Sequence, residues 1–149
     1  MRTLMLLCLT AFGLLACESK KPHNLIVGAW KIDSTYTYYN GFDFTRRASD
    51  RNWATYVYEK DGMMKELKTG HFRQYFFELP SKDTLVVSAT QGGENVRFNI
   101  LHIDEHQMTL KKSRKPVFPG GKQERYEIRY FSRIPLPADS LTLFGDPRD

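Results

Sequence analysis

Hydrophobic and polar residues alternate along most of the chain from Gly28 onward. The apolar row of the first such stretch contains Trp30, Ile32, Tyr36 and Tyr38. Alternation with a period of two is typical of a half-buried antiparallel strand. The pattern therefore predicts a strand that begins at Gly28 and ends near Asn40-Gly41, a dipeptide that favours a tight turn.

Further strand-like segments follow, separated by short links rich in turn-forming residues. They cover residues 53–59, 63–68, 71–78, 84–89, 95–103, 108–113 and 123–133. Residues 42–52 are polar, and we expect a loop or a short helical excursion there. Evenly spaced strands with hairpin links predict an all-β fold, an eight-stranded antiparallel up-and-down β-barrel, because closure removes exposed sheet edges. A β-sandwich is the alternative.

Composition supports a single β-rich domain. The chain has 149 residues, of which 41% are hydrophobic and 13% aromatic. Aromatic and β-branched residues suit a pleated, half-buried surface. The net charge of +5 falls to +4 when Arg2 is removed with residues 1–16 (5 − 1), which is too small a surplus to indicate nucleic-acid binding. We interpret the basic run from Lys111 to Lys115 as a solvated strand end and turn.

The N-terminus has the pattern of an export signal. Arg2 is followed by an apolar run of 13 residues, from Leu4 to Ala16, which is too short to span a bilayer but typical of a secretory signal peptide. The end of the run, Leu14-Leu15-Ala16-Cys17, resembles the lipobox of bacterial lipoproteins, although Leu15 is a less usual residue before Ala16. That resemblance implies a diacylated Cys17 as the mature N-terminus. The alternative is a plain secretory signal in which Cys17 is incidental.

These features predict four regions. Residues 1–16 form the signal peptide, residues 17–27 the lipidated Cys17 with a flexible tether, residues 28–134 the barrel and residues 135–149 an irregular tail. With Cys8 removed, Cys17 is the one remaining cysteine, so no intramolecular disulfide is expected. Lipoproteins with Asp after the Cys are often retained at the inner membrane. Glu18 stands there, so we expect a lipid anchor in the cell envelope, at the outer membrane.

The ordered segments resemble the short lipocalin-like lipoproteins of bacteria. The matching pieces are Gly28-Ala29-Trp30, Tyr58-Glu59-Lys60-Asp61-Gly62, Gly70-His71-Phe72, Phe98-Asn99-Ile100-Leu101-His102-Ile103, Met108-Thr109-Leu110 and Tyr130-Phe131-Ser132-Arg133. The resemblance implies that Gly28, Trp30 and Arg133 close the bottom of the barrel, with the guanidinium stacked on the indole. The chain lacks the second and third motifs of larger lipocalins, which leaves the ligand class open.

Few residues are placed for catalysis or metal binding. The one cluster of ligand-type side chains runs from His102 to His106, and we expect these side chains to diverge at a hairpin tip, so no metal site is predicted. The sequence has neither a Gly-x-Ser-x-Gly elbow nor a Gly-rich phosphate loop. We therefore predict a protein that is not an enzyme, without a cofactor.

A row of aromatic residues is the remaining candidate for a binding site. It contains Tyr36, Tyr38, Tyr56, Tyr58, Phe76, Phe98, Tyr126 and Tyr130. The rings either fill the core or, in part, line an open mouth for a small hydrophobic or amphipathic ligand. In the last strand the row is interrupted, because Phe131 and Arg133 fall on the other face, which predicts a β-bulge near Tyr130.

The sequence is compatible with two functions. One is a monomeric, lipid-anchored barrel that binds or sequesters a small hydrophobic molecule at the open end, opposite Trp30. The other is a closed barrel that acts through its outer surface as an envelope interaction protein, an inhibitor or an accessory subunit. An interior cavity distinguishes the two.

Overall fold

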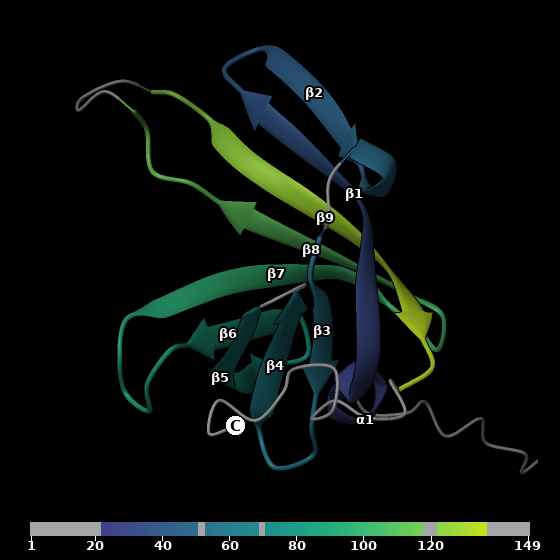
Figure 1. The fold of residues 1–149 in the computed structure, drawn as a ribbon. Coiled ribbons are helices and arrows are strands. Elements are labelled where there is room, and N and C mark those ends of the chain that lie inside the picture. Colours follow the sequence, from purple (N-terminus) through teal and green to yellow (C-terminus); the bar gives the residue numbers. More distant parts are fainter. Residues whose placement is uncertain (1–21, 51–52, 69–70, 118–121, 137–149) are drawn as a thin grey trace, which may run out of the picture.

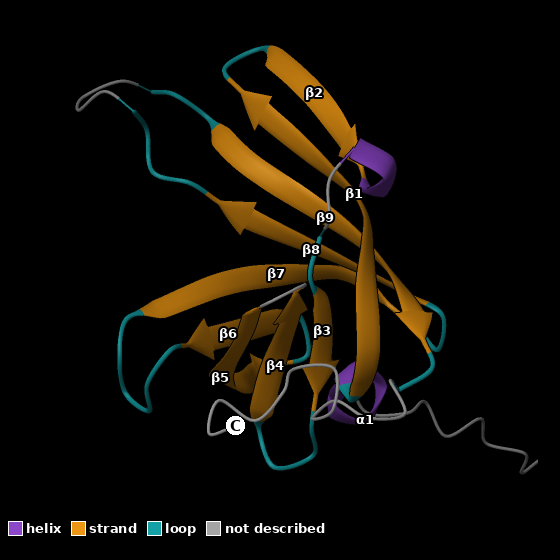
Figure 2. Cartoon of the chain, viewed as in Figure 1, coloured by secondary structure: helices purple, strands orange, loops and turns teal. Residues whose placement is uncertain are grey.

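Strands make up most of the computed structural model, which describes residues 22–50, 53–68, 71–117 and 122–136 (Figure 2). The elements are α1 (Pro22–Ile26), β1 (Gly28–Tyr39), β2 (Phe42–Arg47), the 3₁₀ turn η1 (Ala48–Asp50), β3 (Thr55–Tyr58), β4 (Met63–Lys68), β5 (His71–Ser81), β6 (Thr84–Ser88), β7 (Asn95–Ile103), β8 (Gln107–Ser113) and β9 (Arg125–Ile134). The predicted signal peptide, Cys17 and residues 137–149 of the predicted tail lie outside the described residues.

Eight of the strands close into an antiparallel barrel. The sheet order is β2-β1-β3-β4-β5-β6-β7-β8-β9, and an additional pairing of β1 with β9 closes it. β1 makes this possible because its start, Gly28 to Lys31, pairs with β3 on one side while nearly all of its length pairs with β9 on the other. The prediction of an all-β, eight-stranded up-and-down barrel is confirmed.

One further strand, β2, lies where we expected only a loop or a short helical excursion over residues 42–52. The 3₁₀ turn η1 is the helical part of that range. Asn40 and Gly41 have φ angles of 46° and 95°, and Tyr39 pairs directly with Phe42. Two successive positive φ angles are those of the tight turn that an Asn-Gly pair favours. All six residues of β2 are exposed, so this strand continues the sheet above the barrel and adds nothing to the core (Figure 1).

The floor of the barrel includes residues that we expected in the tether. α1 places Ile26 in the core with no exposed surface, and the indole Nε1 of the fully buried Trp30 donates a hydrogen bond of 2.7 Å to the Ile26 carbonyl. The guanidinium carbon of Arg133 lies 4.2 Å from the Trp30 ring centroid. α1 therefore closes this end of the barrel, and Arg133 covers the edge of the indole.

A bulge in β1 decides which side chains face the interior. Ile32 pairs with Phe131, but the next pair is Ser34 with Tyr130, so Asp33 is the extra residue. Paired residues on antiparallel strands point to the same face of the sheet. Phe131 is buried, so its partner Ile32 faces the interior, whereas Tyr130 is 40% exposed, so its partner Ser34 faces outward. The even-numbered residues of β1 therefore change face at the bulge. The irregularity expected near Tyr130 therefore lies opposite that residue, on β1.

Candidate functional site

A cavity of about 290 Å³ lies inside the barrel. Its lining comes from β3, β4 and β5 on one side and from β6, β7, β8 and β9 on the other: Tyr56, Tyr58, Met64, Glu66, Arg73, Tyr75, Val87, Val96, Phe98, Leu110, Lys112, Arg129 and Phe131. A water molecule occupies about 30 Å³ of liquid and a methylene group is of similar size, so the space holds about ten such groups. The interior is therefore large enough for a small molecule.

The floor of the cavity is apolar. Tyr58, Met64, Leu110 and Phe131 are each less than 5% exposed. The rings of Tyr58 and Phe77 meet edge to face at 5.1 Å, as do those of Tyr56 and Phe131 at 6.0 Å. Such edge-to-face pairs hold aromatic side chains in fixed orientations. The floor is thus a rigid apolar surface.

Two tyrosines converge on one carboxylate in the wall. The hydroxyls of Tyr75 and Tyr56 donate hydrogen bonds to Glu66, at 3.1 Å and 3.5 Å. Burial, together with the Glu66 charge, raises the pKa of Tyr56 to about 12. Burial also raises the pKa of Tyr58, so both phenols are neutral at physiological pH. They offer hydroxyl groups rather than charges to a ligand.

Two cations lie at the face of one aromatic ring. The Lys112 ammonium is 5.6 Å and the Arg129 guanidinium carbon 5.5 Å from the centroid of Phe98. Both distances fall within the range of cation–π attraction. A third cation, Arg73, also lines the cavity and stands opposite Glu66 in the β4–β5 register. The polar part of the lining therefore holds three cations and one carboxylate.

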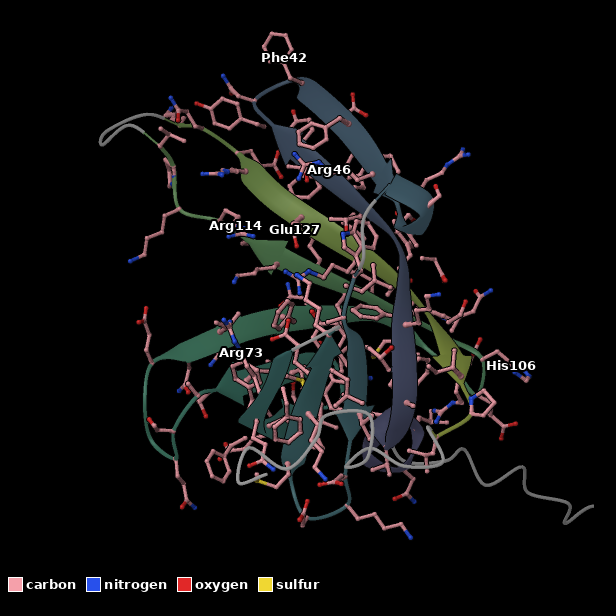
Figure 3. All side chains as sticks on the ribbon, viewed as in Figure 1. Phe42, Arg46, Arg73, His106, Arg114 and Glu127 are labelled. Atoms are coloured by element: carbon pink, nitrogen blue, oxygen red, sulfur yellow. The ribbon has the colours of Figure 1, made fainter. Side chains whose placement is uncertain are left out.

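Glu127 connects Arg129 to a further arginine. Its carboxylate accepts hydrogen bonds from Arg129 Nε at 2.5 Å and from Arg114 Nη2 at 2.8 Å. Burial alone would raise the pKa of Glu127, but the two guanidinium groups outweigh burial and the pKa is lowered. Figure 3 shows Arg114 beside Glu127, where β8 ends and β9 begins, whereas His106 lies at the opposite end of these two strands.

The wall of the barrel opens between β7 and β8. Their pairing ends at Asn99 with Lys111, so the first half of β7 pairs with β6 alone (Figure 1). A hollow of about 510 Å³ lies there, and it shares Val96 and Lys112 with the interior cavity. Its rim carries Arg97, Lys111, Lys112, Arg114 and Lys115 against one acidic residue, Glu94. This positively charged hollow adjoins the cavity, and we refer to it as the side entrance.

The eight predicted aromatic residues are divided between the two faces of the sheet. Tyr56, Tyr58 and Phe98 line the cavity. Phe76 does not, because its neighbour Phe77 is the residue in the core. Tyr36 and Tyr38 face away from it because of the bulge at Asp33 on β1. Tyr126 and Tyr130 face away because they alternate with the inward row of Arg129 and Phe131 on β9.

Three of the outward tyrosines form a cluster of their own. The rings of Tyr38 and Tyr126 stack at 4.9 Å, and Tyr36 lies 6.2 Å from Tyr126. The Lys111 ammonium lies 4.0 Å from the Tyr126 centroid. The expectation that all eight rings face the interior is wrong for these three tyrosines, for Tyr130 and for Phe76.

The sequence interpretation missed the polar residues of the lining. Lys112 was expected in a solvated run, yet it continues the inward row of Met108 and Leu110 along β8. Arg129 continues the inward row of Phe131 along β9 in the same way. Extending the alternation of inward and outward residues past the last apolar residue of each strand predicts that both cations face inward. Glu66 and Arg73 follow the same logic on β4 and β5.

The predicted His102–His106 cluster is a structured turn. Contrary to the expected divergence, His102 Nε2 lies 2.8 Å from Asp104 Oδ2. The other Asp104 oxygen accepts hydrogen bonds from the backbone N–H groups of His106 and Gln107, both at 2.7 Å. Within the ranges that the structure describes, no three His, Cys, Asp or Glu side chains are grouped to hold a metal ion.

Comparisons with protein-family models, with curated proteins and with solved structures find no match for this chain. Among the residues that the structure describes, no helix is long and apolar enough to cross a membrane.

Proposed function

We propose that this protein is a lipid-anchored protein of the cell envelope whose barrel binds or sequesters a small amphipathic molecule without chemical conversion. The observation that carries this proposal is the interior cavity of about 290 Å³, with an apolar floor and a polar mouth. Binding sites for small molecules are concave, mostly apolar and equipped with a few polar groups. A barrel that was merely a closed scaffold would need no such space.

The proposed cellular location is based on the sequence. The lipobox-like Leu14-Leu15-Ala16-Cys17 supports acylation of Cys17, and Glu18 favours the outer membrane. We place the chain with the short lipocalin-like lipoproteins, on the ordered motifs between Gly28 and Arg133 and on the stacking of Arg133 over Trp30. Because β1 and β9 close the barrel, most strands have both edges paired, which favours a monomer.

A second candidate function uses the outer surface. Phe42 is 77% exposed and Phe44 is 46% exposed, both on β2, and the Arg46 guanidinium lies 4.8 Å from the Phe44 ring. Exposed aromatic residues beside arginine are common in protein interfaces. In this alternative the hairpin of β1 and β2 contacts an envelope partner, and the cavity has no ligand.

Native mass spectrometry of the full-length protein, purified from its host in mild detergent, separates the two functions. We expect a copurified small molecule in the wild type and its loss in Val96→Trp, because Val96 lines the mouth and the indole would fill it. Val117→Trp is the matched control, since Val117 is 52% exposed and away from the cavity lining. Absence of any copurified molecule, or an equal loss in both variants, would favour the outer-surface function.

A further inference from the structure

The charges around the cavity are unbalanced. Arg73, Lys112 and Arg129 line it, against Glu66 alone. Including the directly bonded Arg114 and Glu127 brings the count to four cations and two carboxylates, a surplus of two positive charges (4 − 2). Arg73 and Arg114 are exposed to solvent, so the surplus acts mainly on the half-buried Lys112 and Arg129, where it favours a counter-charge.

Lys112 is one of the cations that contribute to this surplus. Within the described ranges, no carboxylate oxygen lies within ion-pair distance of its ammonium group, which rests against Phe98. Burial and repulsion from Arg114 and Arg129 lower the pKa of Lys112. An anion placed beside it would relieve both effects.

Arg129 has unused hydrogen-bond donors beside the same Phe98 ring. Its bond to Glu127 uses Nε, and no bond from its terminal Nη groups is found within the described part of the chain. Arginine presents five N–H donors in a planar fork that suits carboxylate and phosphate oxygens. Lys112 and Arg129 both lie near the Phe98 ring and repel each other, so an acidic head group beside that ring would be attracted by both cations.

We propose that the ligand is a small anionic amphiphile, whose acidic head group lies between Lys112 and Arg129 and whose short apolar chain lies on the floor formed by Tyr58, Leu110 and Phe131. This inference rests on the proposed ligand-binding function and names the ligand class. The space for about ten heavy atoms limits the chain to medium length.

The side entrance fits the same ligand. Its rim has five cations, including Lys112, and one carboxylate, so it attracts anions and repels cations. A charged cleft of this kind raises the local concentration of an oppositely charged ligand. An anionic amphiphile would enter between β7 and β8 and meet Lys112, which belongs to both the rim and the cavity.

Calorimetric titration of the full-length protein with three probes of equal chain length tests the proposal. The probes are octanoate, octan-1-ol and octylamine, which share the apolar chain and differ in head-group charge. We expect octanoate to bind at least tenfold more tightly than octan-1-ol, and octylamine not at all, because a charge-assisted hydrogen bond is worth about tenfold or more.

Two substitutions and one control locate the head group. Lys112→Gln should weaken octanoate binding about tenfold or more and leave octan-1-ol binding within about twofold. Glu127→Gln should strengthen octanoate binding about threefold, since it removes a nearby negative charge. Lys31→Gln is the control for charge, because Lys31 is exposed on β1 away from the cavity, and it should leave all affinities within about twofold.

The results separate the two proposals. Equal binding of octanoate and octan-1-ol, with the cavity occupied, would overturn the anionic head group and leave the proposed function intact. Failure of all three probes to bind would overturn both. Because Lys112→Gln and Glu127→Gln are expected to act in opposite directions, general loss of folding cannot produce the predicted pair of results, and a decrease in both would contradict the proposal.

Discussion

The guanidinium of Arg133 covers the indole of Trp30, with 4.2 Å between the guanidinium carbon and the ring centroid. The same group donates hydrogen bonds to the backbone carbonyls of Val27, at 2.8 Å, and Leu25. One side chain of the last strand therefore holds the first strand and the segment from α1 together. We therefore expect the floor of the barrel to depend on this contact.

Replacement of Arg133 should destabilise the barrel. We expect Arg133→Met to lower the free energy of unfolding by about 2 kcal/mol, from the lost cation–π contact and the two unpaired carbonyls. We expect no larger loss of stability, because Arg133 Nε is itself buried without a partner among the described residues, and its removal offsets part of the cost. Arg133→Lys should recover part of the loss, since it keeps the charge. Urea unfolding followed by circular dichroism measures both, and equal stability of Arg133→Met and the wild type would contradict the role of this contact.

Gly28 should be less replaceable than another glycine of similar conformation. Its φ angle is +134°, and a Cβ there would displace Arg133 Nη1, which is bonded to the Val27 carbonyl. Gly41 also has a positive φ, +95°, but a Cβ there would meet nothing within 4 Å. We expect Gly28→Ala to lower the unfolding free energy by at least about 1 kcal/mol more than Gly41→Ala, in the same urea assay. Equal losses would mean that backbone strain alone explains both.

The β7–β8 turn should lose stability in acid. Backbone N–H groups of Gln107 and His106 lower the pKa of Asp104 to about 2. A lowered folded-state pKa means that Asp104 stabilises the fold above its ordinary pKa near 4, and that this contribution disappears as the pH falls from about 4 to 2. The melting temperatures of the wild type and Asp104→Ala should therefore differ at pH 6 and converge at pH 2. A difference that stays constant with pH would exclude this role of the carboxylate.

Membrane attachment should depend on one thiol. If Cys17 carries the lipid, Cys17→Ser should move the protein from the membrane fraction to the soluble fraction, because several acyl chains make a durable anchor. Fractionation of host cells followed by intact-mass measurement tests this. Conversion of Cys8→Ser is the control, since Cys8 lies within the predicted signal peptide. A Cys17→Ser protein that stays in the membrane with the wild-type lipid mass shift would show that the anchor lies elsewhere.

Local patterns were sufficient to predict the barrel. Each of the eight barrel strands shows either a period-two pattern or a turn signal, such as Asp61-Gly62, where Gly62 has a φ angle of 86°. β2 was not predicted because every residue in it is exposed, so its sequence has no alternating row of buried apolar residues. The Asn40-Gly41 turn was the available signal, since such a turn joins two strands.

The site was harder to predict than the fold, because its residues depend on strand parity. The row of Trp30 and Ile32 faces inward, but the bulge at Asp33 moves Tyr36 and Tyr38 to the other face. A bulge depends on pairing with a distant strand, and the sequence of β1 does not reveal it. The cations Lys112 and Arg129 look like surface residues in sequence, and only barrel closure turns them toward Phe98.

We propose above all that a small amphiphile occupies the interior of the barrel. Two adjacent methionines report on it, because Met64 lines the cavity and is 4% exposed, while Met63 pairs with Phe76 on the other face of the sheet. The measurement is a titration of methyl-labelled protein with octanoate, followed by the ¹H–¹³C resonances of the two methyl groups. We expect a saturable shift of the Met64 resonance with little change at Met63. A Met64 resonance that does not move, or a larger shift at Met63, would contradict it.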